Sequence, residues 1–210
     1  MNNKGIWIVI EGIDGAGKTS AIATIEEVFK QIQLKTKNYR EPGGTGLGER
    51  VRHILKADNI EMLPIAEVLL FYAARVQLLE ECILPNLNQG IHVILDRHEL
   101  STYAYQAGGR GLDIEVIQQI SNSCMPKRKP DLTFFLALDP KVALERVINR
   151  GDLDHYESQP LAFYQRIALS YERFAADYPN VVCIDANQSL IEVQQDIRSE
   201  LENFLAAKFS

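Results

Sequence analysis

The residues with the clearest chemical pattern are Gly12-Ile-Asp-Gly-Ala-Gly-Lys18-Thr19, which match a phosphate loop: glycine, four residues, then Gly-Lys-Ser/Thr. Glycines let backbone N–H groups wrap an anion closely, because positive φ costs glycine little. In such a loop the lysine bridges the outer phosphates and the Ser/Thr hydroxyl is a ligand of Mg²⁺. The motif therefore predicts a nucleoside-triphosphate site formed by Gly12, Ile13, Asp14, Gly15, Ala16, Gly17, Lys18 and Thr19.

The segments on both sides of the loop fit this prediction. Residues 6–10 form an apolar, β-branched run of strand length, bounded by Gly5 and Gly12. Residues 19–34 carry apolar side chains at a helical period. Strand, loop and helix then aim backbone N–H groups and a helix N-terminus at a bound phosphate.

A second chemical pair, Asp96 and Arg97, follows the apolar strand expected over residues 91–95. Phosphate-loop enzymes use an aspartate in this context to hold Mg²⁺, whereas the simpler alternative for Asp96 is a cap on the next segment. The Arg97 guanidinium can clamp two anionic groups, and its alternative is a surface ion pair.

The rest of the chain alternates strands with helices. We expect strands at residues 36–39, 132–138 and 181–184 besides the two named above. Helices are expected at 47–55, 64–84 (ended by Pro85), 114–121, 140–150, 160–178 and 190–207, with a loop at 108–111. The pattern predicts an α/β, P-loop NTPase-type three-layer fold: a five-stranded, mostly parallel sheet with helices on both faces. Functional sites should lie at the carboxyl ends of the strands.

Length and composition narrow the class of protein. The 210 residues suit a single domain over 1–210, with the polar, turn-rich segment at about 150–159 as a short mobile lid. A net charge of −6 argues against a nucleic-acid partner. No segment predicts a membrane span or a signal peptide, and the three cysteines are scattered singly, so we expect a reduced, cytoplasmic protein.

Several short runs, in this order and spacing, resemble bacterial thymidylate kinases over almost the whole chain. They lie at residues 11–19, 40–45, 71–75, 96–98, 105–111 and 130–132. The resemblance implies a P-loop nucleoside monophosphate kinase that transfers the γ-phosphate of ATP to thymidine monophosphate. The product, thymidine diphosphate, would serve dTTP biosynthesis for DNA synthesis. It also implies Mg²⁺ and a homodimer.

The same resemblance assigns roles in binding the acceptor nucleoside. Asp14 would accept a hydrogen bond from the acceptor's 3′-hydroxyl, and Phe71 and Arg75 would stack on thymine and donate to its exocyclic carbonyl oxygen. Thr102 and Tyr105 would contact the base and crowd the 2′ position, with Gln106 as a further pocket residue. Periodicity alone favours Phe71 as a core residue and does not separate Tyr105 from Tyr103.

Arginines are the candidates for the transferring phosphates. Arg40 and Arg97 would bind the acceptor phosphate, with Pro42 shaping the nearby wall. Some thymidylate kinases carry a loop arginine where this chain has Gly15, and those without it use a lid arginine. We therefore expect Lys18, Asp14, Arg97 and Arg150 to be catalytic, with Arg146 as the alternative to Arg150. Both lid arginines could instead only complement a helix C-terminus.

Three other functions agree less well with the sequence. A kinase for guanylate, cytidylate or a deoxynucleoside would share the phosphate loop, but Asp14 and the run Phe71–Arg75 argue against it. A switch GTPase should carry Asn-Lys-x-Asp, which the sequence lacks. A structural protein with a relic site should show damaged motif positions, whereas Lys18, Thr19 and Asp96 are intact.

Overall fold

A parallel sheet forms the centre of the molecule. The computed structural model describes residues 4–57, 60–151 and 153–209. In that part of the chain the strands are β1 (Trp7–Glu11), β2 (Thr36–Arg40), β3 (His92–Asp96), β4 (Leu132–Ala137) and β5 (Val181–Asp185). Their order is β2-β3-β1-β4-β5 and all neighbours pair in parallel, with Trp7 opposite Val93 and Ile8 opposite Leu132. The predicted P-loop type of α/β fold is confirmed.

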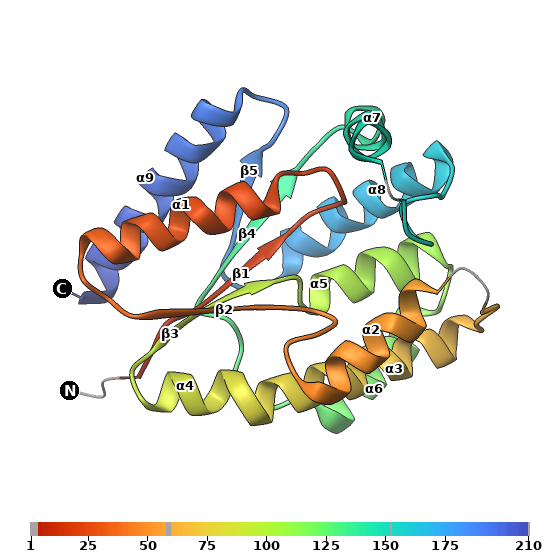
Figure 1. Cartoon of the computed structure of the whole chain (residues 1–210), viewed down its shortest axis with the longest axis horizontal. Coiled ribbons are helices and arrows are strands. Elements are labelled where there is room, and N and C mark those ends of the chain that lie inside the picture. Colours follow the sequence, from red (N-terminus) through yellow and green to blue (C-terminus); the bar gives the residue numbers. More distant parts are fainter. Residues whose placement is uncertain (1–3, 58–59, 152, 210) are drawn as a thin grey trace.

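Helices cover both faces of this sheet (Figure 1). They are α1 (Lys18–Gln31), α2 (Gly46–Lys56), α3 (Pro64–Leu78), α4 (Leu84–Asn88), α5 (Glu99–Thr102), α6 (Ile114–Cys124), α7 (Pro140–Arg150), α8 (Leu161–Asp177) and α9 (Leu190–Phe209). Two π-helical segments, η1 (Leu79–Ile83) and η2 (Tyr103–Gly109), complete the described elements. No helix in the described ranges is both long enough and apolar enough to cross a membrane.

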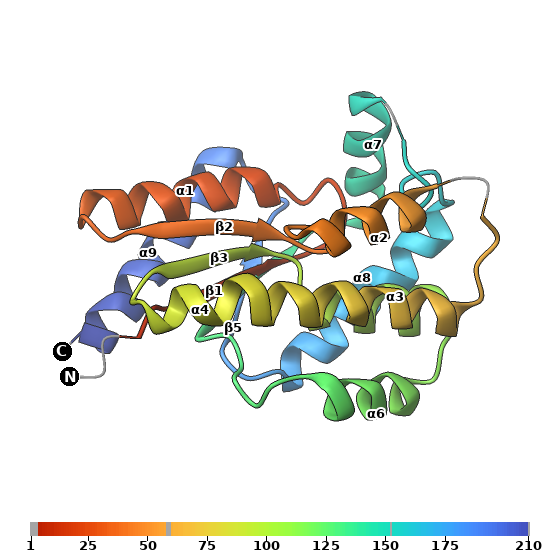
Figure 2. The same ribbon diagram turned by 60° about the horizontal axis from the view of Figure 1, so that its bottom comes forward.

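The central strand β1 shows why both faces must be covered. All five of its residues are buried, with Ile8 and Ile10 in one apolar cluster and Trp7 and Val9 in another. Side chains of a strand alternate between faces, so a strand without a polar face needs a layer on each side. Figure 2 shows α1 and the α3–α4 run on opposite sides of the sheet.

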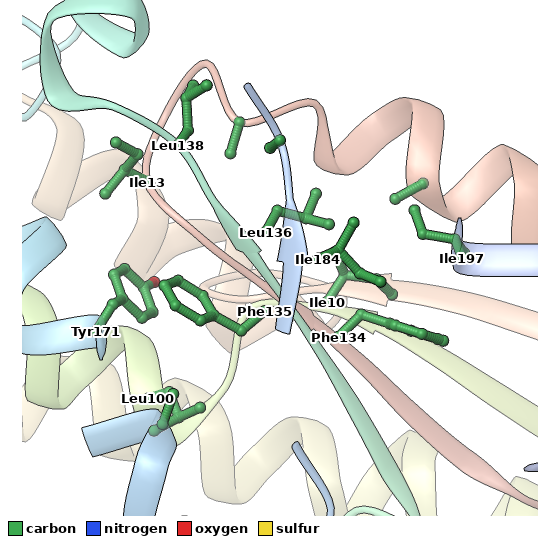
Figure 3. Close-up of a cluster of buried hydrophobic side chains, with 14 of the residues drawn as sticks. Ile10, Ile13, Leu100, Phe134, Phe135, Leu136, Leu138, Tyr171, Ile184 and Ile197 are labelled. Atoms are coloured by element: carbon green, nitrogen blue, oxygen red, sulfur yellow. The ribbon is translucent and has the colours of Figure 1, made fainter. Parts of the chain in front are cut away.

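The larger apolar cluster reaches from the sheet to α8. Phe135 of β4 and Tyr171 of α8 stack with ring centroids 5.3 Å apart (Figure 3). Tyr171 is fully buried, so its ring packs α8 against the sheet. Its hydroxyl also takes part in the polar network described below.

The prediction that Pro85 ends the long helix is wrong. Helical structure continues from α3 through η1 into α4, where Pro85 occupies the first turn. A proline ring clashes with the carbonyl four residues earlier in a regular α-helix. Here the N–H of Leu84 bonds to the carbonyl of Leu79 in a wider π turn just before Pro85. The change of hydrogen-bond register lets the chain pass the proline without stopping.

The predicted loop at residues 108–111 is also partly wrong, because Gly108 and Gly109 belong to η2. A Cβ at Gly108 would stand 2.0 Å from Ser170 Oγ, and one at Gly109 would stand 2.7 Å from the Phe163 ring. These glycines therefore allow η2 to pack closely on α8 instead of breaking the helix.

Smaller differences concern helix ends and exposed apolar residues. The first helix ends at Gln31, three residues before the predicted end, and Ile32 is 47% exposed. Gln33 adopts a left-handed φ of 59°, which a continuing helix does not allow. In α2, Val51 and Leu55 are buried, whereas Leu47 and Ile54 are exposed.

Candidate active site

The carboxyl ends of the strands open into a cavity of about 680 Å³, where all predicted catalytic, substrate-binding and metal-binding residues meet. These lining residues are Asp14, Lys18, Thr19, Arg40, Pro42, Phe71, Arg75, Asp96, Arg97, Thr102, Tyr105, Gln106 and Arg150. Of the remaining loop residues, Gly15 and Gly17 also line the cavity. Gly12, Ile13 and Ala16 do not, and Ile13 and Ala16 pack into the apolar core.

The phosphate loop has the expected connection between strand and helix. Gly17 precedes α1 with a left-handed φ of 92°, a conformation that glycine adopts without strain. Lys18 Nζ donates to the carbonyl oxygens of Gly12 at 3.2 Å and Ile13 at 3.1 Å, so the ammonium lies over the loop. Burial and the nearby Arg97 charge lower the pKa of Lys18, which an arriving phosphate would counteract.

Asp96 has one carboxylate oxygen that could bind a metal ion. Its Oδ1 is buried and has no hydrogen-bond partner among the described residues, which is costly for a carboxylate oxygen. Asp96 lines the same cavity as Lys18 and Thr19. An oxygen pair from a carboxylate and a hydroxyl suits Mg²⁺, which keeps several waters and binds through few protein ligands. Within the described ranges no cluster of three or more His, Cys, Asp or Glu residues supplies an all-protein metal site.

Asp14, Arg97 and Tyr105 form one hydrogen-bonded unit. Arg97 Nη2 donates to Asp14 Oδ1 at 2.5 Å, and the Tyr105 hydroxyl donates to Asp14 Oδ2 at 2.7 Å. Burial alone would raise the pKa of Asp14, but the charges of Arg97 and Lys18 and the hydrogen bonds from Arg97 and Tyr105 together outweigh burial and lower it. Tyr103 instead packs its ring on Phe174, 5.5 Å between centroids, and does not line the cavity. The structure thus separates the two tyrosines, which the sequence period did not.

Further contacts fix Arg97 at the end of β3. Its Nη1 donates to the Gly12 carbonyl oxygen at 3.0 Å and to the Tyr171 hydroxyl at 3.2 Å. Arg97 has a φ of 70°, which is uncommon for a residue with a Cβ. These hydrogen bonds therefore hold the Arg97 side chain in the cavity wall. Arg97 does not form the surface ion pair that the sequence left as an alternative.

Another part of the cavity wall contains Phe71, Arg75, Thr102 and Gln106. Arg75 is only 1% exposed; its Nε donates to Glu41 at 2.5 Å, and its Nη2 donates to Thr102 Oγ1 at 3.0 Å. Burial alone would lower the pKa of Arg75, but Glu41 raises it, so this buried cation stays charged. Arg75 Nη1 is buried and has no acceptor within the described part of the chain. A planar ligand with a carbonyl oxygen would satisfy this donor.

The charged wall of the cavity holds two further arginines. Arg40 lines it but pairs with Glu49 of α2 at 3.1 Å, and its side chain is 54% exposed. Arg52, which the sequence reasoning missed, lines the cavity and donates from Nη1 to the Pro42 carbonyl oxygen at 3.1 Å. Burial and the nearby Arg40 charge lower the pKa of Arg52, and the surrounding carboxylates offset this only in part. The only feature of the sequence that pointed to Arg52 was its position one residue after Val51, which is buried.

The segment predicted as a lid, apart from residue 152, which lies outside the described ranges, contributes to the cavity wall. Arg150 pairs with Glu157, and both line the cavity. Arg146 donates to the Gly15 carbonyl oxygen at 3.2 Å and lines a smaller, separate cavity beside Gly17 and Gln188. Tyr156 was also missed; its ring lies 6.4 Å from Phe71 and 6.1 Å from Tyr105. The sequence shows only an aromatic residue within a polar segment.

Comparisons with known proteins agree with this geometry. The sequence profile of the family described as "Thymidylate kinase" matches residues 10–197. The thymidylate kinase of Legionella pneumophila (strain Corby) is 44% identical over 203 residues, covering 96% of each chain. That of Shewanella frigidimarina (strain NCIMB 400) is 44% identical over 210 residues, covering 99% of this chain and 97% of its own. The resemblance drawn from short motifs is therefore confirmed, and this chain belongs to the thymidylate kinase family.

Proposed function

We propose that the protein transfers the γ-phosphoryl group of ATP to thymidine monophosphate, giving thymidine diphosphate for dTTP biosynthesis. The observation that carries this proposal is one cavity that holds both halves of the reaction. Lys18 and Thr19 of the phosphate loop share it with Phe71 and Arg75, which can receive a planar base. Family membership supports the same reaction.

The nucleoside end of the cavity fits thymidine through complementary groups. The free Nη1 of Arg75 would donate to a carbonyl oxygen of thymine, and Phe71 would stack on the ring. The Tyr105 hydroxyl donates a hydrogen bond to Asp14 Oδ2 at 2.7 Å. The Asp14 carboxylate would also accept a hydrogen bond from the 3′-hydroxyl of thymidine monophosphate. Tyr105 and Tyr156 would limit the space around the sugar.

The phosphate end supplies positive charge without a nucleophile of its own. Arg40, Arg52 and Arg97 would bind the acceptor phosphate, while Lys18 would bridge the outer phosphates of ATP. Thr19 and Asp96 would hold Mg²⁺, which supplies charge neutralisation of the ATP phosphates when bound. The smaller cavity beside Gly17 offers room on the other side of the loop for the rest of the donor. Catalysis would then rest on in-line positioning and electrostatic stabilisation.

Arg150 is the proposed lid arginine of the transfer step. It lines the larger cavity that Lys18, Phe71 and Arg75 share, whereas Arg146 bonds to the loop backbone and lines the smaller cavity. Closure of the lid around residues 150–159 would exclude water and limit ATP hydrolysis. We also propose that residues 1–210 form one domain, since the lid and the phosphate loop serve one cavity.

The assay that tests the proposal measures ADP release with a panel of acceptors. Thymidine, deoxyuridine, guanosine and cytidine monophosphates are offered with ATP and Mg²⁺, and thymidine monophosphate is expected to have the highest kcat/KM. A better rate with any other acceptor would contradict the assignment. Omission of Mg²⁺ is expected to abolish turnover, which tests the role of Thr19 and Asp96.

Two further proposals concern the oligomeric state and the cellular location of the protein. A homodimer is supported by the exposed apolar side chains Ile65 and Leu69 on one face of α3. A cytoplasmic location is supported by the three cysteines Cys82, Cys124 and Cys183, all of which are free thiols. Sedimentation at micromolar concentration tests the dimer.

A further inference from the structure

Gln106 differs from Arg75, the proposed donor to the exocyclic carbonyl oxygen of the base, in one chemical respect. A guanidinium has donors only, so Arg75 can present nothing but N–H groups to a base. The amide of Gln106 has nearly the same shape in both orientations, but one presents an acceptor and the other a donor. Some other residue must decide which of the two faces the ligand.

Glu67 of α3 makes that contact. It is 2% exposed, and its Oε1 accepts a hydrogen bond from Gln106 Nε2 at 2.7 Å. A carboxylate only accepts, so the NH₂ group of Gln106 must point to Glu67 and its carbonyl oxygen must point away. None of the described residues donates to that carbonyl oxygen. Gln106 therefore faces the cavity it lines as a hydrogen-bond acceptor.

Arg110 supplies the counter-charge for the buried carboxylate of Glu67. Its Nε lies 3.3 Å from Glu67 Oε2, and its Nη2 donates to the Met62 carbonyl oxygen at 2.7 Å. A buried carboxylate requires such a partner, because an isolated buried charge is strongly unfavourable. One oxygen of the Glu67 carboxylate thus lies beside the Arg110 guanidinium, and the other fixes the orientation of the Gln106 amide.

We propose that Glu67 is a specificity-positioning residue: it fixes the polarity of the Gln106 amide so that the cavity reads thymine and rejects cytosine. Thymine presents an acceptor at position 4 and an N–H donor at N3. The Arg75 donor and the Gln106 acceptor complement this edge. Cytosine presents an amino donor and an unprotonated N3, so it meets a donor with a donor and an acceptor with an acceptor.

This inference rests on the proposed function, because it assumes that the base of the acceptor lies beside Arg75 and Gln106. It adds a prediction that the function alone does not make. Uracil has the same carbonyl and N–H edge as thymine and differs only in the methyl group. Discrimination between thymine and uracil should therefore not depend on Glu67.

The test is Glu67→Gln, which keeps the shape but gives Gln106 a partner that can donate as well as accept. We expect the ratio of kcat/KM for thymidine monophosphate to that for deoxycytidine monophosphate to fall by about tenfold or more, the effect of one mispaired buried hydrogen bond. The ratio for thymidine to deoxyuridine monophosphate should stay within about twofold. Glu80→Gln, at an exposed position in η1, is the matched control and should change neither ratio.

Two results would overturn the inference. One is an unchanged thymidine-to-deoxycytidine ratio in Glu67→Gln. The other is an equal fall of both ratios, which indicates general distortion of the cavity. In a Gln106→Ala background the Glu67→Gln change should have no further effect on selectivity, because Glu67 acts through Gln106. If loss of the Arg110 partner prevents folding, Glu67→Gln/Arg110→Gln replaces the single variant with the same readouts.

The proposed function and this inference fail in different ways. If the unaltered protein does not prefer thymidine monophosphate, the proposed function is wrong. If it does, but Glu67→Gln keeps the full preference over deoxycytidine monophosphate, only the role of Glu67 is wrong.

Discussion

Replacing Arg150 by alanine is expected to slow phosphoryl transfer while leaving the fold almost unchanged. The Arg150 side chain is 58% exposed and its ionic partner is Glu157, which is mostly buried. Ion pairs with so exposed a partner contribute between 0 and about 1 kcal/mol to stability, because solvent screens them. Glu157 keeps a second contact, since it accepts from the backbone N–H of Asp154 at 3.2 Å.

The expected effect on catalysis is much larger than the effect on stability. A preorganised donor that meets charge developing in the transition state typically contributes about 10²–10³-fold to kcat, or about 3–4 kcal/mol. Binding of the two nucleotides should change by less than about threefold, because Lys18, Arg40, Arg52 and Arg97 remain in the cavity. Arg150→Ala should therefore reduce kcat with little change in KM.

The assay compares four proteins by steady-state ADP release and by thermal unfolding. Arg146→Ala is the matched control, because it removes the same charge from the same helix but from the side of the smaller cavity. Glu157→Gln measures what the ion pair alone contributes to the lid. If Arg150→Ala turns over like the unaltered protein, or if Arg146→Ala shows the larger loss of kcat, Arg150 is not the residue that meets the transferring group.

Two other outcomes are expected from the packing and the buried charges. Gly108→Ala should lower the urea midpoint by the equivalent of about 1–3 kcal/mol, because the added Cβ would stand 2.5 Å from Ser170 Cβ. Gly46→Ala is the control, because a Cβ at Gly46 would meet no atom within 4 Å. Glu99 has its pKa lowered to about 2, since His98, Lys129 and Ser121 together outweigh burial. Stability from Glu99 is then fully present above pH 4.5 and is lost as the pH falls toward 2. The difference in unfolding free energy between the unaltered protein and Glu99→Gln should shrink across that window.

The sequence predicted the features that short patterns encode. Strand β1, the loop Gly12–Thr19 and the start of α7 at Asp139-Pro140 each follow from residue type and spacing over fewer than ten residues. The Asp139 side chain accepts from the N–H of Lys141, as an N-cap should. The family motifs placed Phe71, Arg75 and Tyr105 on one cavity, which periodicity alone could not do.

Features that short sequence patterns do not encode were not predictable in this way. The passage of the chain through Pro85 depends on a π turn, and the glycines of η2 depend on the surface of α8. Arg52 and Tyr156 reach the cavity only because α2 and the lid fold over it. The partner of Gln106 is 39 positions away in the sequence, so no local pattern shows which way its amide points.

The ion pairs around the cavity divide its arginines into two kinds. The Arg75–Glu41 pair has both side chains less than 5% exposed, and separating it would leave an uncompensated buried charge. Arg40 and Arg150 are more than half exposed in their pairs with Glu49 and Glu157, and such pairs are weak. Phosphate groups can therefore draw Arg40 and Arg150 from their carboxylates at small cost, whereas Arg75 must stay where Glu41 holds it. We therefore propose that the exposed Arg40 and Arg150 serve the phosphates, whose positions change during the reaction, whereas the fully buried Arg75 serves the base, whose position does not.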